Sequence, residues 1–308
     1  MARARRGEPV DGVLLLDKPS GITSNLALQR ARRLLGAAKA GHTGTLDPMA
    51  SGLLPLTFGE ATKFSSDLLE ATKTYEAEIK LGVATSTGDP EGEITATADV
   101  DASIERIGAI LAQLSGSIEQ VPPMHSALKR DGRPLYAYAR AGMQVERAPR
   151  AVTIHRLELR AFEEDRLRVL VECSKGTYVR VLAQDIGNLL GCGAHLAGLR
   201  RTRVGELALE NAITLESLEA SATEKRRALL LPLDALIGKL PRVELEASLA
   251  DRFSHGQRLA LGPGNPSGRV AVVGPHSRLL GIAQLDQRGL LAPQRLVHQP
   301  INQNESKT

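Results

Sequence analysis

Tryptophan is absent from this sequence of 308 residues, and aromatic residues make up only 3% of it. No apolar run approaches the roughly 18 residues that a membrane span requires. The N-terminal stretch MARARRGEP also lacks the apolar segment of a secretory signal. These absences predict a cytoplasmic protein without a membrane-spanning segment.

Cysteine is equally scarce, with only Cys173 and Cys192 in the chain. The closely spaced cysteine pairs of zinc sites are missing, and so is the HExxH pattern of zinc proteases. The phosphate-binding GxxxxGK[ST] loop is missing as well. We therefore expect no metal and no cofactor, and we interpret both cysteines as buried, reduced thiols.

Positive charge is mildly in excess, with a formal net charge of +4 and a pI of about 9.2. Solvated surface arginines would explain any single cluster of cations. Several clusters together favour a polyanionic partner such as a nucleic acid. The clusters are Arg3, Arg5 and Arg6; Arg30, Arg32 and Arg33; RRTR at 200–203; and KRR at 225–227.

The length of 308 residues predicts one large domain and one smaller domain, and hydrophobic periodicity predicts both strands and helices. Alternating or continuous apolar residues indicate strands, and apolar residues at helical spacing indicate helices. A helix at 25–36 would be capped by Ser24, with Leu26 on its inner face. We expect strands at 13–16, 74–85, 152–159 and 167–173, and further helices at 103–114 and 181–190.

Two segments depart from this regular pattern. Residues 122–150 carry six cations from Lys129 onward against two acids, with Tyr136 and Tyr138 among them. They indicate an excursion from the domain with a short helix, or alternatively a disordered surface loop. After about residue 237, short strands separated by Gly and Pro predict a small all-β module at 238–300, and a disordered tail follows at 301–308.

The stretch GHTGTLDPMASG places Asp47 between Leu46 and Pro48 on a turn rich in glycine. A turn or capping aspartate before proline explains the pattern as well as a functional carboxylate does. Glycines allow close approach of a ligand. The apolar residues Leu53, Leu54 and Leu56 that follow suit a wall around a dry pocket.

Six stretches occur together in the order and spacing of one known family. The chain resembles the bacterial tRNA pseudouridine-55 synthases of the TruB family over residues 10–215, and more loosely after that. The stretches are GVLLLDKPSGITS, AGHTGTLDPMASGLLPLTFGEATKF, KTYEAEIKLG, PPMHSALKRDGRPLYAYARAG, SKGTYVRVLAQDIG and GCGAHLAGLRRTRVG. The GHTGTLDPMASG block is very specific, although relatives that work with guide RNAs have a similar block.

The resemblance implies an α+β pseudouridine synthase fold, with a mixed and mainly antiparallel sheet flanked by helices. A small C-terminal all-β domain similar to the PUA domain would follow. The expected domains are a catalytic domain at 1–237 with an RNA-binding thumb at about 122–150, and an RNA-binding domain at 238–300.

The resemblance also assigns the site. Asp47 would be the catalytic aspartate, Arg180 would pair with it and keep it charged, and Tyr75 would stack on the base and relay a proton. The substrate site would be lined by His42, Tyr75, Tyr178 and Leu199, with His42 as a wedge that replaces the flipped base. His125 and His195 are interpreted as structural.

The activity implied is conversion of uridine 55 in the T loop of tRNA to pseudouridine. It needs no redox cofactor or nucleotide, and the target base must be extruded from the loop. The partner would be the T arm of tRNA, bound by a monomer without an obligate protein partner, and the protein could also aid tRNA folding. Two alternatives remain: a non-catalytic RNA-binding protein of the same shape, and an isomerase guided by partner proteins.

Overall fold

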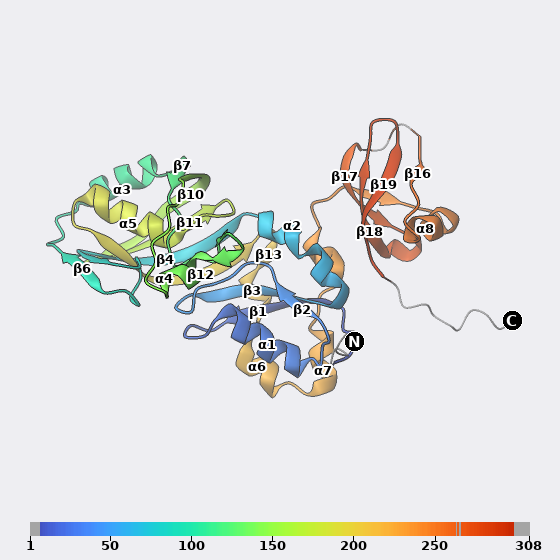
Figure 1. Ribbon diagram of the computed structural model, residues 1–308, viewed down its shortest axis with the longest axis horizontal. Helices are drawn as coiled ribbons and strands as arrows, with labels where there is room; N and C mark the ends of the chain where they lie inside the picture. The colour runs from blue at the N-terminus through green and yellow to red at the C-terminus, as the bar shows by residue number, and fades with distance from the viewer. Residues whose placement is uncertain (1–6, 263, 265, 299–308) are drawn as a thin grey trace.

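The computed structural model describes residues 7–262, 264 and 266–298. The predicted arginine cluster at Arg3, Arg5 and Arg6 and the predicted tail at 301–308 lie outside these ranges. Figure 1 shows a long sheet with helices on its faces and a separate small β domain at one end. Among the described residues, no helix is long and apolar enough to cross a membrane.

The large sheet has ten strands and is mixed, as the sequence predicted. Most neighbours are antiparallel, and the parallel pairs are β1 with β14 and β3 with β12. Along the sheet the order is β14 (Ile213–Thr214), β1 (Gly12–Lys18), β3 (Ser51–Phe58), β12 (Ala194–Val204), β4 (Lys73–Leu81), β11 (Arg166–Cys173), β10 (Arg150–Glu163) and β7 (Gly116–Gln120). Two further strands join its sides, β13 (Leu207–Ala208) on β12 and β2 (Ala40–His42) on β3.

Helices cover the two halves of this sheet and create two cores. On one half, α3 (Ile104–Gln113) and α5 (Val179–Leu190) pack over β4, β10, β11 and β12. On the other half, α1 (Ser24–Leu34) and α6 (Leu215–Ala220) pack over β1 and β3. The two halves meet at β12, in the middle of the sheet.

Local sequence signals explain several of the helix ends. Ser103 caps α3 through its side chain, and α5 ends at Gly191, which has the left-handed conformation that glycine tolerates. Two expectations for α1 were wrong. Its cap is Thr23, not Ser24, and Leu26 is exposed because Ala27, Leu28 and Ala31 form the buried face.

The predicted strand at 74–85 is interrupted at Gly82, whose φ of +75° ends β4. The chain then enters a separate two-stranded ribbon, β5 (Val83–Thr85) and β6 (Ile94–Thr97). The remaining short elements are α2 (Ser65–Glu70), α7 (Thr223–Ala228) and the 3₁₀ helices η1 (Gly59–Phe64), η2 (Leu209–Asn211), η3 (Leu233–Leu236) and η4 (Pro275–Ser277).

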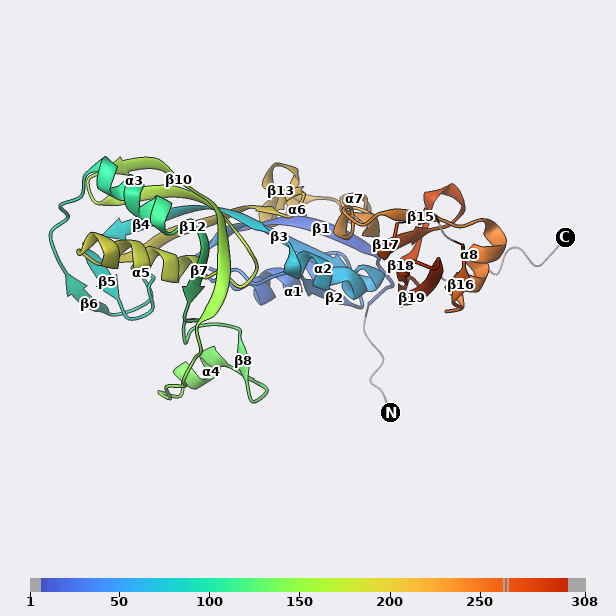
Figure 2. The ribbon, with the colours of Figure 1, turned by 90° about the horizontal axis from the view of Figure 1, so that it is seen from above.

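The segment at 122–150 leaves the sheet between β7 and β10, and Figure 2 shows it projecting well away from the body of the protein. It contains β8 (Lys129–Arg130), β9 (Arg133–Pro134) and the expected short helix, α4 (Leu135–Ala139). Leu135 is buried, and Arg133 and Arg140 lie over the rings of Tyr138 and Tyr136 at 4.9 and 5.5 Å. Arginine–tyrosine stacking, together with hydrogen bonds to backbone carbonyls, therefore contributes to the structure of this projection.

The C-terminal β domain holds a five-stranded sheet in the order β15 (Arg242–Glu244), β17 (Gly268–Val273), β18 (Leu279–Leu285), β19 (Leu290–Leu296) and β16 (Leu259–Ala260). The expectation of an all-β module was wrong in one respect, because α8 (Ala247–Ser254) packs Phe253 into its core. One face of this domain shares a core with Val13 and Phe64 of the large domain.

Candidate active site

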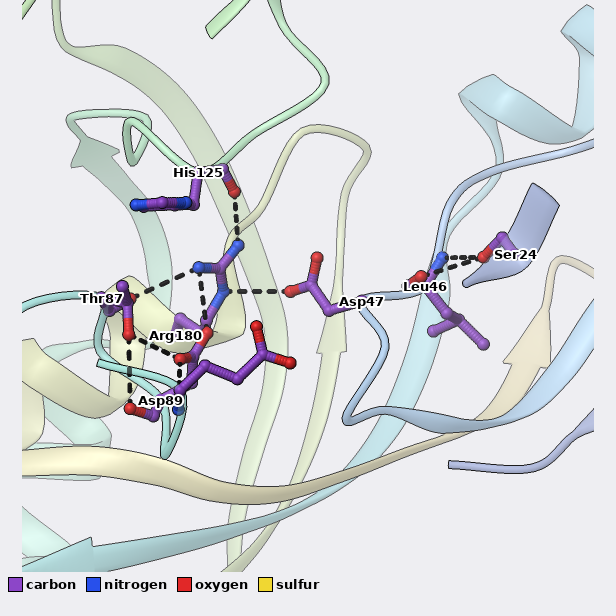
Figure 3. A network of polar contacts seen from close by, with 8 residues as sticks. Ser24, Leu46, Asp47, Thr87, Asp89, His125 and Arg180 are labelled. Carbon is purple, nitrogen blue, oxygen red and sulfur yellow. Dashed lines mark hydrogen bonds and ion pairs between the residues drawn. The ribbon is translucent and has the colours of Figure 1, made fainter. Parts of the chain in front are cut away.

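The glycine-rich loop at 43–50 connects β2 to β3, and its middle is fixed by the start of α1. The Leu46 amide donates to Ser24 Oγ at 2.8 Å, and Ser24 Oγ donates to the Leu46 carbonyl at 2.9 Å (Figure 3). Leu46 is buried. Ser24 therefore anchors the loop instead of capping the helix, and the next residue, Asp47, projects from a fixed backbone.

Asp47 meets Arg180 from the first turn of α5, with 3.0 Å between Asp47 Oδ2 and Arg180 Nε. The pairing predicted from the sequence is thus present in the structure. The helix begins two residues earlier than expected, at Val179, so Arg180 is a helical residue held in one orientation. Figure 3 shows the two side chains pointing toward each other.

The guanidinium of Arg180 is also bound on its other sides. Its Nη1 lies 3.2 Å from Asp89 Oδ2 and donates to the Thr87 carbonyl at 3.3 Å, and its Nη2 donates to the His125 carbonyl at 2.7 Å. Arg180 and Asp89 side chains are 5% and 7% exposed, whereas Asp47 is 36% exposed. One buried cation thus serves two carboxylates, and Asp47 is the more exposed of the two.

Because Arg180 is shared with Asp89, the pKa of Asp47 differs from the expectation. Burial raises the pKa of its carboxyl, and the nearby negative charge of Asp89 raises it further. Arg180 and Lys18 act in the opposite direction, but the pKa remains above its ordinary value of 3.8. The expectation that Arg180 alone would offset burial was therefore incomplete, because Arg180 is divided between two acids.

A cavity of about 500 Å³ opens beside Asp47, and every residue predicted for the substrate site lines it. That size is typical of a small-ligand pocket. His42 lies at the end of β2, Tyr75 on β4, Leu199 on β12, and Tyr178 just before α5. The structure thus gathers side chains from four separate elements around one carboxylate.

The apolar wall of this cavity differs from the expected one. Leu53, Leu54 and Leu56 are completely buried in β3 and belong to the cores, so they do not line it. The leucines that do line it are Leu46, Leu69 and Leu199. Because β3 carries apolar residues on both of its faces, both faces are buried in cores and these side chains cannot line the cavity.

The backbone next to Tyr178 is fixed by Gln120 at the end of β7. The Tyr178 amide donates to Gln120 Oε1 at 2.9 Å, and Gln120 Nε2 donates to the Tyr178 carbonyl at 3.3 Å. Tyr178 is half-buried and faces the cavity. The thumb segment begins immediately after Gln120, so this pair also ties the base of the thumb to the site.

The protonation states of two cavity residues follow from burial. Burial raises the pKa of Tyr75 above 10.0, although the nearby Arg201 opposes the shift. Burial and the charge of Arg201 both lower the pKa of His42 below 6.5. At neutral pH the cavity therefore holds a neutral phenol and a neutral imidazole, both able to lie against an uncharged base.

Several residues of the site were missed by the sequence analysis. Asp89 belongs to the stretch GDPEG, which indicates only a turn, and nothing in that pattern distinguishes it from a surface aspartate. His125 was interpreted as structural, yet its carbonyl binds Arg180 and it lines the cavity. Lys73 also lines the cavity, and burial lowers its pKa to about 8.

The arginine clusters are only partly available to a polyanion. Arg201 is completely buried, Arg200 pairs with Asp17 at 2.7 Å, and Arg226 donates to the Leu34 and Leu218 carbonyls. Counting Arg201 as a surface cation was therefore wrong, and Arg200 and Arg226 are partly occupied by contacts within the protein. Arg140 of the thumb lines a second cavity of about 590 Å³, which Asp47 also lines.

Both cysteines are free and buried, as predicted, and burial raises the pKa of Cys173 to about 11. Among the described residues, no three His, Cys, Asp or Glu side chains are grouped so that they could hold a metal ion. His195 Nδ1 donates to the Val83 carbonyl, 2.8 Å away, and His195 lies outside the cavity lining.

Three family profiles match successive segments of the chain. Residues 32–179 match the profile of the TruB family pseudouridylate synthase N-terminal domain. Residues 180–238 match the tRNA pseudouridylate synthase B C-terminal domain, and residues 241–297 match the pseudouridine synthase II TruB C-terminal domain. Together these profiles span most of the sequence.

Curated relatives are similar over nearly their full length. The tRNA pseudouridine synthase B of Aromatoleum aromaticum is 61% identical over 288 residues, covering 94% of this chain and 93% of the relative. The tRNA pseudouridine synthase B of Dechloromonas aromatica is 57% identical and covers 95% and 97%. A chain in the crystal structure of a Cbf5–Nop10–Gar1 complex has the same fold, with a TM-score of 0.71, 25% identity and coverage of 97% and 91%.

Proposed function

The chain belongs to the TruB family of pseudouridylate synthases, and from this premise we propose that it converts uridine 55 in the T loop of tRNA to pseudouridine. The enzyme class follows from family membership, and the tRNA substrate follows from the names of the relatives. The observation that carries the site assignment is the Asp47–Arg180 pair, which faces a cavity lined by Tyr75, Tyr178 and Leu199.

The reaction is an isomerisation. The N1–C1′ glycosidic bond of uridine breaks, the uracil turns within the pocket, C5 bonds to C1′, and the C5 proton is lost while N1 gains one. Atoms and electrons balance without a redox partner. The protein must therefore hold the free base, supply an ionised carboxylate at the sugar and move one proton.

We assign the carboxylate to Asp47. It acts either as a nucleophile at C1′ or as a base toward the C2′ proton, and both roles need the ionised form. Three features support the assignment: its loop is fixed by Ser24, its carboxylate opens to the cavity, and Arg180 orients it through Nε. Because its pKa is raised, activity should be lost on acidification at a pH above 3.8.

We assign the contacts with the base to Tyr75, Tyr178 and Leu199. Tyr75 offers a flat ring for stacking and a hydroxyl that stays protonated at neutral pH. Such a hydroxyl can relay the C5 proton by giving up its own proton as it accepts another. Leu199 and Tyr178 also line the cavity and would contact the remaining parts of the base.

The target uridine is stacked inside the T loop and must be flipped out to reach Asp47. We propose that His42 fills the vacated position, since its neutral ring borders both cavities beside Asp47. The thumb at 122–150 would close over the T arm. Its cations and stacked tyrosines suit the phosphates and unstacked bases of an RNA loop.

For the rest of the chain, the proposed division is a catalytic domain at 1–237 and an RNA-binding domain similar to PUA at 238–300. We propose that the protein works in the cytoplasm as a monomer without an obligate protein partner. Because binding would open and release a T arm, it could also assist tRNA folding.

The test uses an unmodified tRNA transcript that carries tritium at uracil C5. Bonding of C5 to C1′ releases the tritium into water. In the Asp47→Asn variant we expect release to fall by at least about 10²-fold, the scale of one catalytic group, while tRNA affinity is retained. Asp101→Asn, the same change at an exposed position shortly before α3, serves as the matched control.

Two results would contradict the proposal. Unchanged tritium release in Asp47→Asn would remove the assigned role of this carboxylate. Tight tRNA binding by the wild-type protein without any pseudouridine would instead identify a non-catalytic RNA-binding protein. Mapping pseudouridine in the product tRNA then checks the position, because release from a uridine other than 55 would contradict the assigned target.

A further inference from the structure

Arg201 is the largest side chain that is almost completely buried, with 1% of its surface exposed, and it lies against the active-site cavity. A guanidinium removed from water costs several kcal/mol unless its partners compensate. Its guanidinium donates to two backbone carbonyls, those of Leu53 at 2.7 Å and Gly44 at 3.1 Å, and it also interacts with the side chain of Tyr75.

The two carbonyls belong to different parts of the site. Leu53 lies on β3, in the core of the sheet, whereas Gly44 lies in the loop that carries Asp47. Arg201 therefore links the loop to β3, while Ser24 of α1 holds the same loop at Leu46. Gly44 has a φ of +132°, a conformation that gives its carbonyl a direction few other residues adopt.

The strand register places Arg201 at the junction of the two halves of the sheet. On β12 it pairs with Gly52 of β3 in parallel and with Tyr75 of β4 in antiparallel register. A Cβ added at Gly52 would lie 2.3 Å from the Arg201 carbonyl oxygen, so only glycine permits this approach. One residue is thus in register with the strand of Tyr75 and bonded to the loop of Asp47.

The charge of Arg201 also affects its neighbours. It acts to lower the pKa values of His42, Tyr75, Lys18 and Lys73, which surround the loop and the cavity. A replacement that removed the charge would therefore be detectable at His42. A replacement that kept the charge but lost the two-pronged geometry would leave the pKa of His42 close to its value in the wild type.

We propose that Arg201 is a positioning residue for the isomerisation, which holds the Gly44–Asp47 loop at a fixed distance from Tyr75 by bridging the Gly44 and Leu53 carbonyls. This inference rests on the proposed function. It assigns to Arg201 a role in the rate of the chemical step and none in RNA affinity, because its buried guanidinium cannot reach a phosphate.

The test compares Arg201→Gln and Arg201→Lys with wild type in single-turnover tritium release and in tRNA binding. We expect the rate constant to fall by about 10²-fold in Arg201→Gln, the cost of displacing a reacting group by about 1 Å. In Arg201→Lys, a single ammonium cannot serve both carbonyls in the same geometry, so the rate falls by at least about tenfold. Affinity and its salt dependence stay at wild-type values in both.

A second readout separates geometry from charge without relying on activity. The His42 imidazole, followed by NMR, should titrate at a higher pH in Arg201→Gln, because a nearby positive charge is gone. In Arg201→Lys it should titrate near the wild-type value although the rate is low. Arg166→Gln, the same change at an exposed residue of β11 paired with Glu78, is the control and should change neither readout.

Should Arg201→Gln fail to fold, Gly44→Ala tests the same link from the loop side, and we expect the same loss of rate with unchanged affinity. A full rate in Arg201→Lys or in Gly44→Ala would overturn the positioning role. A weaker affinity with a smaller salt slope would overturn it too, since it would identify a phosphate contact. Absence of turnover in the wild type would overturn the proposed function and this inference together.

Discussion

The Asp47–Arg180–Asp89 arrangement makes a quantitative prediction for Asp89→Asn. Asp89 Oδ2 lies 3.2 Å from Arg180 Nη1, and at an effective dielectric constant of about 20 two such charges attract by about 5 kcal/mol. Part of this attraction offsets the desolvation of two buried charges. An asparagine amide can still accept a hydrogen bond, and Arg180 keeps its bonds to Asp47, Thr87 and His125.

We therefore expect Asp89→Asn to lower the free energy of unfolding by about 2 kcal/mol, within the range for a hydrogen bond to a charged group. The measurement is equilibrium unfolding in urea at pH 7. Asp165→Asn removes a carboxylate from a partly exposed pair with Lys80 and should cost less than about 1 kcal/mol.

The same substitution should change the pH dependence of tritium release. The negative charge of Asp89 raises the pKa of Asp47, so its removal lowers that pKa. Asp47 then stays ionised to a lower pH, and the acid limb of the rate profile shifts toward lower pH. The reasoning would be refuted by a stability loss no larger than that of Asp165→Asn, or by an acid limb that moves to higher pH.

Three further predictions follow from burial and backbone geometry. Gly52→Ala should destabilise the fold by about 3 kcal/mol because the added Cβ would meet the Arg201 backbone. Gly142 also has a positive φ but is surrounded by open space, so Gly142→Ala should cost about 1 kcal/mol. Chemical unfolding measures both free energies, and equal losses would contradict the argument. Cys173, whose pKa is raised to about 11, should resist thiol reagents at pH 8 until urea is added, and labelling of the native protein would argue against its burial. Arg140→Gln should weaken tRNA binding and reduce the slope of log K against log salt by about 1, while an unchanged slope would exclude a phosphate contact.

Much of the fold could be predicted from the sequence because its signals are local. Alternation along a strand and apolar residues at helical spacing reflect which face is buried, and they placed the strands around Val13 and Val169 and the helix that begins after Ser103. The helix α8 was missed because it spans only eight residues and lies between two very short strands, β15 and β16. The family resemblance supplied the pairing of Asp47 with Arg180, which no spacing argument connects across 132 intervening positions.

By itself, the sequence determined the periodic elements, the glycine-rich loop and the residue types from which a uridine-isomerising site can be built. Only the tertiary structure decided which charges meet, because burial and partners depend on contacts between distant segments. It placed Asp89 on the far side of Arg180 and buried Arg201 beneath the loop of Asp47. An aspartate in a turn can face water or a buried cation, and an arginine in a basic cluster can be exposed or buried. The folded chain decides between these outcomes, since desolvation and Coulomb attraction act through space and not along the sequence.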